Sequence, residues 1–400
     1  MKVVDPCRRR DLRPAWVQVD LDAVSHNASL LCSLANPALL CAVVKADGYG
    51  HGATGVARAA LAGGASWLAV ALVEEGIRLR DDGIEAPVLL LSEPPEEAMN
   101  AVVEYGLTPT IYSSLGLRAA SLAAARNGRG GQLGVHVKVD TGMHRVGAAE
   151  GEVADLASAV VADPHLALHG LFTHLAVADR VSDPYTDLQL GRFDEAVGNL
   201  HARGLRPGIV HAANSAATLW HPRSHYTMVR CGIALYGLNP TSSYSALLDL
   251  LPSLSLLARV SFVKTVPAGE SLSYGLHYRL ERDSVIATVP IGYADGVPRN
   301  LAASGGEVLV GGRRCRVAGT VTMDQILVDC GPDATVSRGD EVVLIGAQGE
   351  EYVGAEEWAN RVGTISYEVV CALSGRLPRI YLPTSDANAE HSASGGPGVS

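Results

Sequence analysis

LLCAVVKA, at residues 39–46, is a short apolar stretch rich in valine and leucine, and seven more stretches of this kind follow it. They are WLAVAL (67–72), APVLLLS (86–92), TPTIYS (108–113), LGVHVKVD (133–140), LHGLFTHLA (168–176), GIVHAANS (208–215) and MVRCGIALYG (228–237). Continuous apolar runs of this length are typical of strands buried on both faces. The segments between them, such as AASLAAARN (119–127) and EVADLASAVVAD (152–163), are rich in helix formers. This alternation of eight strands with helices predicts a (β/α)8 barrel.

An open, doubly wound sheet is the alternative arrangement for such an alternation. Its usual phosphate-binding signature, GxGxxG after the first strand, is absent from this sequence, which weakens the alternative. From about residue 250 the helical stretches become rare, and short runs such as LARVSFVKTV (257–266) alternate with glycine-rich turns. This change predicts a second, mostly β domain.

We therefore expect two domains, the barrel over residues 16–250 and the mostly β domain over residues 251–383. Residues 1–15 can belong to the second domain, and the strand-like segment WVQVDLDAV (16–24) could join either one. The last residues, 384–400, carry little apolar content and are expected to be disordered.

Composition excludes several classes of protein. The 400 residues are 48% hydrophobic and 18% charged, with a formal net charge of −10, so we expect no nucleic-acid partner. No apolar run approaches the ~18 residues of a membrane span, and the charged start MKVVDPCRRRDLRPAW is unlike a signal peptide. The seven cysteines are odd in number and form no CxxC pair, which argues against a disulfide framework and against a structural zinc site. We expect a cytoplasmic enzyme.

Polar side chains gather at the carboxyl ends of the eight runs, where barrels of this kind carry their active sites. The first run ends in VVKADGYGHG, so Lys45 emerges from a buried strand into a glycine-rich turn. On this feature alone, Lys45 is as readily a surface lysine as one that forms a Schiff base in a desolvated site.

The motif AVVKADGYGHG (42–52) resembles the cofactor-lysine motif of alanine racemases. Seven further motifs resemble the same family in the same order: VKVDTGMHRVG (137–147), FTHLA (172–176), HAANSAAT (211–218), MVRCGIALYG (228–237), IGYADGVPR (291–299), TVTMDQ (320–325) and TISYEV (364–369). Together they extend over almost the whole chain, which makes chance similarity implausible. The resemblance implies a barrel that binds pyridoxal 5'-phosphate, fused to a β domain, in agreement with the architecture above.

The resemblance also implies which residues hold this cofactor. Loops after strands seven and eight often form the phosphate site of a barrel, and backbone amides and hydroxyls suit such an anion. The implied phosphate ligands are the Ser215 hydroxyl, the amides of Gly232 and Ile233, and the phenols of Tyr49 and Tyr367.

Arg230 lies in an otherwise apolar run, where an arginine alone would indicate a structural ion pair. The resemblance assigns it to the pyridine nitrogen of the cofactor, with His211 holding it. Since arginine keeps its proton, the ring nitrogen stays uncharged, which weakens the ring as an electron sink and should limit side reactions such as transamination.

Racemisation needs a base on each face of a planar carbanion. By resemblance, Lys45 removes the α-proton of D-alanine and Tyr293 removes that of L-alanine, with His174 linking Tyr293 to Arg230. In the family the tyrosine reaches the barrel of a partner subunit, and Met323 with its neighbour Asp324 comes from the same partner. The resemblance therefore implies a homodimer with shared active sites.

Two basic residues remain in the predicted site. Arg145 resembles the arginine near the substrate carboxylate, and Lys138 would face it as an unfavourable like charge. Many relatives carbamylate the matching lysine, which would make Lys138 an anion. The chain departs from the family at His144, where many relatives have glycine, at Thr322 and at Asp47.

The expected function is interconversion of L- and D-alanine, which supplies D-alanine for peptidoglycan. The alternatives are a racemase of another small amino acid, a decarboxylase on a related barrel, and a non-catalytic protein that binds the same cofactor. A decarboxylase would need an acidic partner for the pyridine nitrogen, where this chain has Arg230. A non-catalytic binder is typically a barrel alone, so the domain that carries Tyr293 argues against it.

Overall fold

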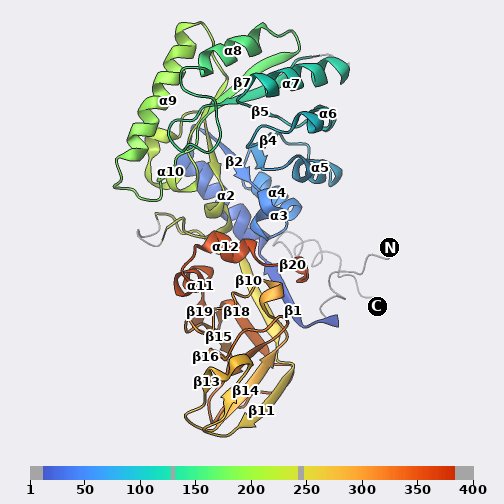
Figure 1. Cartoon of the computed structure of the whole chain (residues 1–400), viewed down its shortest axis with the longest axis vertical. Helices are drawn as coiled ribbons and strands as arrows, with labels where there is room; N and C mark the ends of the chain where they lie inside the picture. The colour runs from blue at the N-terminus through green and yellow to red at the C-terminus, as the bar shows by residue number, and fades with distance from the viewer. Residues whose placement is uncertain (1–11, 128–130, 242–246, 383–400) are drawn as a thin grey trace, which may run out of the picture. The chain divides into compact units, whose positions relative to one another are not determined.

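The computed structural model describes residues 12–127, 131–241 and 247–382, and the predicted disorder of 384–400 lies outside the described residues. The chain divides into two compact units (Figure 1). The barrel unit comprises Ala23–Gly48 and Ala53–Pro252, and the β unit comprises Met1–Asp22, Tyr49–Gly52 and Ser253–Ser400.

Eight parallel strands form the centre of the barrel unit as the structure describes it. They are β2 (Leu39–Val43), β3 (Trp67–Val70), β4 (Val88–Leu90), β5 (Thr110–Ile111), β6 (Leu133–Lys138), β7 (Leu166–Phe172), β8 (Ile209–His211) and β9 (Met228–Cys231). They form two sheets with the orders β4-β3-β2-β9 and β5-β6-β7-β8. A parallel bridge between Leu89 and Thr108 joins β4 to β5, and the Arg230 amide donates to the Ala213 carbonyl across 3.0 Å at the other seam. The predicted (β/α)8 barrel is therefore confirmed.

One helix precedes the first of these strands, and further helices separate the strands along the chain (Figure 1). They are α2 (Leu21–Ala35), α4 (Ala53–Ala62), α5 (Val73–Asp81), α6 (Met99–Glu104), α7 (Ser114–Asn127), α8 (Val153–Ala162), α9 (Tyr185–Ala202) and α10 (Ser215–Trp220). In α9 the buried residues Leu190, Phe193, Ala196 and Leu200 recur at helical spacing, so one face of this helix packs on the barrel while the other meets solvent. Among the described residues, no helix combines the length and apolar character needed to cross a bilayer.

The β unit is built on one large, mostly antiparallel sheet with the strand order β11-β14-β17-β16-β15-β18-β10-β1-β20. Its strands are β1 (Ala15–Val19), β10 (Leu254–Arg259), β11 (Phe262–Val266), β14 (Ser284–Val289), β15 (Glu307–Val310), β16 (Arg313–Ala318), β17 (Ile326–Asp329), β18 (Glu341–Gln348) and β20 (Arg379–Tyr381), with β19 (Glu351–Val353) paired to β18. Two helices, α11 (Ala355–Val362) and α12 (Ser366–Cys371), precede the last strand. Of the strand-like segment 16–24, whose place the sequence left open, the first part lies in β1, which pairs with β10 and β20, whereas the second part begins the helix α2.

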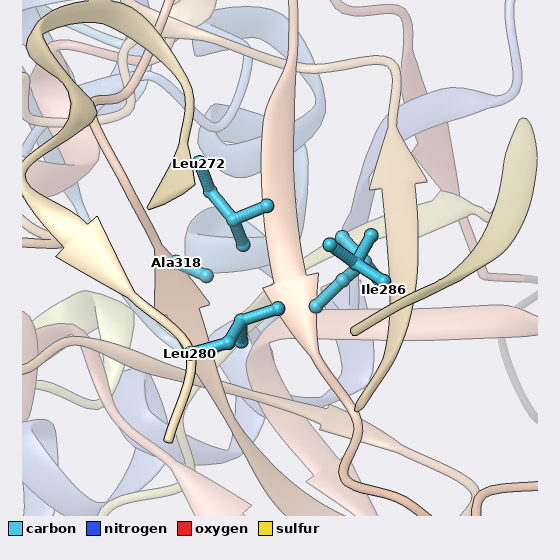
Figure 2. Packing of buried hydrophobic residues seen from close by; sticks show 5 residues of the cluster. Leu272, Leu280, Ile286 and Ala318 are labelled. Atoms are coloured by element: carbon cyan, nitrogen blue, oxygen red, sulfur yellow. The ribbon is translucent and has the colours of Figure 1, made fainter. Parts of the chain in front are cut away.

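A small ribbon, β12 (Ser271–Leu272) with β13 (Tyr278–Arg279), packs on this sheet. Figure 2 shows Leu272, Leu280, Ile286 and Ala318, whose buried side chains join the ribbon segment to β14 and β16. Burying these apolar groups anchors the loop between β12 and β13, which carries Tyr274.

Candidate active site

A left-handed turn follows the first barrel strand, directly after Lys45. In α3 (Lys45–Tyr49) the residues Ala46, Asp47 and Gly48 have φ of 52° to 62° and ψ of 45° to 49°. For residues other than glycine this conformation costs about 1–2 kcal/mol each. Strain of this kind is retained mainly at functional sites, where the surrounding structure enforces it. Lys45 is half-buried at the start of this turn.

Hydrogen bonds hold the strained turn in place. The amide of Ala46 donates to the Glu75 carboxylate across 2.6 Å, and the amide of Ala53 donates to the Asp47 carboxylate across 3.1 Å. Glu75 also accepts from the amides of Ala71 and Leu72, so one carboxylate ties together the loops after β2 and β3. This role of Glu75 was not predicted from the sequence.

The mouth of the barrel gathers positive charge. Lys138 ends β6, with its ammonium 3.3 Å from the Leu91 carbonyl and 5.2 Å from the centre of the Phe172 ring. Burial, followed by the nearby Arg230, Arg145 and Lys45, lowers the pKa of Lys138 to about 7. Lys45, Arg145 and Arg230 therefore all lie close enough to Lys138 to act on its charge. Such a concentration of basic groups attracts an anionic ligand.

Arg230, on β9, is buried at the centre of this cluster. One of its terminal nitrogens donates to Nδ1 of His211 across 2.8 Å. The other approaches the Thr173 carbonyl at 2.9 Å, the Ala212 carbonyl at 3.0 Å and Nδ1 of His174 at 3.2 Å. None of these contacts involves Nε, so the guanidinium keeps a donor for a further acceptor.

These contacts fix the protons of three histidines. Because arginine only donates, Nδ1 of His211 and Nδ1 of His174 are acceptors, and each ring carries its proton on Nε2. Nε2 of His211 then donates to Nδ1 of His136 across 2.9 Å. Burial is the first cause that lowers the pKa of all three, to about 3 for His136 and well below the usual value for the other two. All three rings are therefore neutral at pH 7.

His136 is a residue that the sequence analysis missed. It lies on β6 two residues before Lys138, so the alternation of a strand places the two side chains on the same face. Within the described residues its Nε2 has no hydrogen-bond partner. The spacing could have indicated that His136 points toward the site, but not that it contacts His211.

Ser215 connects the loops after β8 and β9. Its buried Oγ accepts from the amide of Gly232 across 2.9 Å and from that of Ala234 across 3.3 Å. Asn214 caps α10 by accepting from the Ala217 amide at 3.0 Å. Gly232 precedes the short helix η3 (Ile233–Tyr236), so the predicted Ser215, Gly232 and Ile233 lie together in one cradle of hydroxyl and amide groups.

The other two predicted phosphate ligands lie together in the β unit. The ring centres of Tyr49 and Tyr367 are 6.2 Å apart. Next to Tyr49, Gly50 has φ +80°, and an added Cβ would lie 2.3 Å from the Val370 carbonyl oxygen. Arg379 also donates to the Gly50 carbonyl across 2.9 Å. Contacts with α12 and β20 therefore fix the segment Tyr49–Gly52.

Tyr293 and Met323 also lie together in the β unit. The amide of Tyr293 donates to the Thr322 carbonyl at 3.0 Å, and that of Ala294 donates to the Met323 carbonyl at 3.1 Å. A Cβ on Gly292 would lie 2.2 Å from the Thr322 oxygen, so glycine is required for this close approach. The side chains of Tyr293 and Met323 are 40% and 53% exposed, and both are open to a further contact.

The turn that carries Tyr293 is braced from inside. Asp295 is fully buried, accepts from the Gly292 amide at 2.9 Å and forms ion pairs with Arg13 and Arg376. Arg376 also pairs with Asp324 across 2.6 Å. Neither arginine was singled out from the sequence.

Tyr274 is a second exposed tyrosine of the β unit, and the sequence analysis did not name it. It opens η4 (Tyr274–Leu276), where Ser273 and Leu276 have φ of 61° and 53°. The Ser273 hydroxyl donates to the Thr320 carbonyl at 2.7 Å, and the Thr320 hydroxyl donates to the Tyr274 carbonyl at 2.7 Å. The side chain is 75% exposed on this strained, fixed backbone. In the sequence, only a tyrosine followed by glycine between two short strands could have pointed to Tyr274 as a site residue.

Residues 19–240 match the family described as alanine racemase, N-terminal domain, and residues 253–381 match alanine racemase, C-terminal domain. The chain belongs to the alanine racemase family. Its relatives include the alanine racemase of Symbiobacterium thermophilum, 48% identical over 92% of this chain and 97% of that protein. Alanine racemase 1 of Bacillus subtilis is 42% identical over 92% of this chain and 93% of its own. The predicted family and the enzyme class, an amino-acid racemase, are confirmed.

Solved alanine racemases share the fold. The enzyme of Streptomyces lavendulae has a TM-score of 0.88 at 38% identity and covers 94% of this chain and 98% of its own. The enzyme of Bacillus anthracis, solved with bound L-Ala-P, has a TM-score of 0.86 at 39% identity and covers 93% of this chain and 95% of its own. Both agree with a barrel followed by a mostly β domain. Among the described residues, no cluster of His, Cys, Asp or Glu could hold a metal ion.

Proposed function

We propose that this alanine racemase family member interconverts L- and D-alanine by a two-base mechanism with pyridoxal 5'-phosphate, using the residues described above. One observation carries the proposal: a strand-end amine, a buried guanidinium and a hydroxyl–amide cradle occur together in the barrel unit. Each matches a different part of the cofactor, and the charges of Arg230 and Arg145 lower the cost of bringing an anion there.

The donor set fits the cofactor. Ser215, Gly232 and Ile233 would hold its phosphate with Tyr49 and Tyr367, and Arg230 would donate to its ring nitrogen. When bound, pyridoxal phosphate supplies the electron sink that makes the α-proton of an amino acid acidic. Lys45 would hold the cofactor and then serve as one base. Arg145 would receive the substrate carboxylate.

The opposite base is, in this proposal, an exposed tyrosine of the β unit. Tyr293 is the candidate from the sequence motif, and Tyr274 is the candidate from backbone strain. The observations on the backbone favour Tyr274, since strain that the structure enforces concentrates at functional positions. His174 carries its proton on Nε2 and could donate it to a phenolate, which would lower the pKa of the tyrosine it meets.

We further propose a homodimer in which this tyrosine and Met323 enter the site of the partner. The exposure of Tyr293, Tyr274 and Met323 supports a contact with a second chain. In this proposal the enzyme supplies D-alanine for peptidoglycan and works in the cytoplasm.

The test is incubation of the purified protein with pyridoxal phosphate and L-alanine in heavy water, followed by optical rotation and α-deuterium content. The proposal requires loss of rotation together with deuterium at the α-carbon. A panel containing L-serine and larger amino acids separates an alanine racemase from a broad one, because one methylene is worth only about 1–3 kcal/mol of discrimination. Release of carbon dioxide, or no reaction, would overturn it.

A further inference from the structure

Two cysteines of the β unit face each other across neighbouring antiparallel strands. In the ladder between β16 and β17, Arg316 is opposite Asp329 and Val317 is opposite Val328. The next pair in the same register is Cys315 and Cys330. Both side chains are buried and both are free thiols, and the Cys330 thiol donates to the Val328 carbonyl across 3.8 Å. Directly opposed residues on such strands have their Cβ atoms close enough for a short covalent bridge to form with small adjustments.

The thiols border a hollow of about 350 Å³ rich in arginine. Arg282, Arg313 and Arg316 line it together with the two cysteines. The neighbouring Cys330 thiol and the charge of Arg313 lower the pKa of Cys315, whereas the neighbouring Cys315 thiol and burial raise the pKa of Cys330. Since the thiolate is the nucleophile and the charge of Arg313 favours it at Cys315, we expect Cys315 to attack and Cys330 to resolve.

We propose that Cys315 and Cys330 are a redox-active dithiol that a peroxide converts into a cross-strand disulfide. The Cys315 thiolate attacks one peroxide oxygen, the O–O bond breaks, and Cys315 becomes a sulfenic acid while the other oxygen leaves as water after taking up a proton. The Cys330 sulfur then attacks the Cys315 sulfur and displaces the second oxygen as water. In sum, two thiols and one hydrogen peroxide give one disulfide and two waters.

A disulfide between Cys315 and Cys330 would also restrain the loop that carries Met323. Strands β16 and β17 flank the segment 319–325, and Thr320 in that segment holds Ser273 and Tyr274. A covalent bond between the two strands keeps the hairpin closed and lowers the conformational entropy of the unfolded chain. We expect oxidation to raise the unfolding temperature of the full chain by a few degrees and reductant to reverse the rise.

Peptide mapping tests the proposal directly. Trypsin releases Cys315 on the dipeptide Cys-Arg and Cys330 on peptide 317–338, because arginines flank both segments. After treatment of the full-length protein with hydrogen peroxide and alkylation, the disulfide appears as peptide 317–338 enlarged by the dipeptide and is lost on reduction. Two free thiols at these positions after oxidation of the exposed Cys371 would overturn the proposal.

Single serine variants test the assigned roles. In Cys330→Ser, Cys315 has no resolving partner, so dimedone should trap a sulfenic acid at Cys315. In Cys315→Ser, Cys330 should react with neither peroxide nor dimedone under the same conditions, and Cys371→Ser should form the disulfide normally. Equal trapping at Cys330 in Cys315→Ser would contradict the assignment. The double variant Cys315→Ala/Cys330→Val keeps the interior apolar and cannot form the disulfide. A rise in its unfolding temperature after peroxide treatment would also count against the proposal.

Discussion

The guanidinium of Arg230 donates a hydrogen bond to Nδ1 of His211 across 2.8 Å, and this contact fixes where His211 carries its proton. The proton must lie on Nε2, which donates to His136 across 2.9 Å. A permanent cation is thus held by a chain of two neutral rings, and no carboxylate takes part in these contacts. Arg230 can therefore keep its charge for a ligand in the site instead of sharing it with a protein anion.

Two substitutions of His211 should show whether Arg230 needs a hydrogen-bond acceptor at this position or only a side chain that fills the space. His211→Leu removes the partner of Arg230 and leaves a buried charged donor unsatisfied, so we expect a loss of about 3 kcal/mol in the free energy of unfolding. His211→Asn places a carbonyl oxygen near the position of Nδ1 and should lose clearly less. Urea unfolding of both variants, with cofactor affinity from absorbance, measures this. Equal losses would show that Arg230 does not depend on the acceptor.

The buried histidines predict a loss of stability in mild acid. The pKa of His136 is about 3 in the folded chain, so only the unfolded chain takes up this proton when the pH falls below ~6.5. The resulting loss of stability is absent above that pH and grows as the pH falls toward 3, reaching about 2 kcal/mol at pH 5. His136→Asn keeps an acceptor for His211 and removes the titration. Its unfolding free energy between pH 7 and pH 5 should fall less steeply, and an unchanged slope would refute the assignment.

Lys138 should be carbamylated in air-equilibrated buffer. With its pKa lowered to about 7, a large fraction of its amine is neutral at pH 7–8, and only the neutral amine reacts with carbon dioxide. The product is an anion, which would replace a like-charge contact with Arg145 by an attractive one. Carbon-13 NMR with labelled bicarbonate should show one carbamate signal that is absent in Lys138→Ala. A crystal structure with an unmodified ammonium and a chloride between the two residues would disprove it.

The barrel could be predicted from the sequence because each strand is a local apolar run, and Lys45 and Arg230 could be placed because strand ends share one face of the barrel. The turn after Lys45 could not, since Ala46 and Asp47 do not favour positive φ and only Gly48 does. His144 shows the same limit: its φ of 54° lies in the left-handed region, which favours glycine and which the sequence did not predict.

Contacts between residues far apart in the sequence explain the other features that could not be predicted. The segment Tyr49–Gly52 groups with the β unit because Gly50 contacts Val370, far along the chain. The braces Glu75 and Asp295 act on backbone amides that no periodicity reveals. Tyr274 was not predicted from the sequence because hydrogen bonds with Thr320, far along the chain, hold its backbone, whereas Tyr293 was predicted from its motif.

Phenylalanine variants should decide between the two tyrosines. The variant that lacks the base should lose racemisation by about 10²-fold or more, while Lys45 still exchanges the α-proton of D-alanine. The backbone strain predicts this result for Tyr274→Phe and a smaller effect for Tyr293→Phe. Proton exchange of each enantiomer in heavy water measures both steps separately. The reverse ranking would restore the assignment to Tyr293, and full activity of both variants would eliminate a tyrosine base.

Mixed dimers should show whether the two bases of one site come from different chains. Lys45→Ala and the inactive tyrosine variant from the preceding test should each be nearly inactive alone. When the two are refolded together, a two-fold dimer that shares its sites has one site with both defects and one that is intact. Random pairing makes half of the dimers mixed, so activity should recover to about a quarter of the unmodified enzyme.

The control is a pair of differently tagged chains, which shows by co-purification that subunits have exchanged. If both bases belonged to one chain, every site in every dimer would lack one of them, and mixing would restore nothing. No recovery despite demonstrated exchange would therefore reject the shared site, while the membership in the alanine racemase family would stand unaffected. Recovery near a quarter would also show that the exposed tyrosine acts across the interface, because no other arrangement of two defects regenerates an intact site.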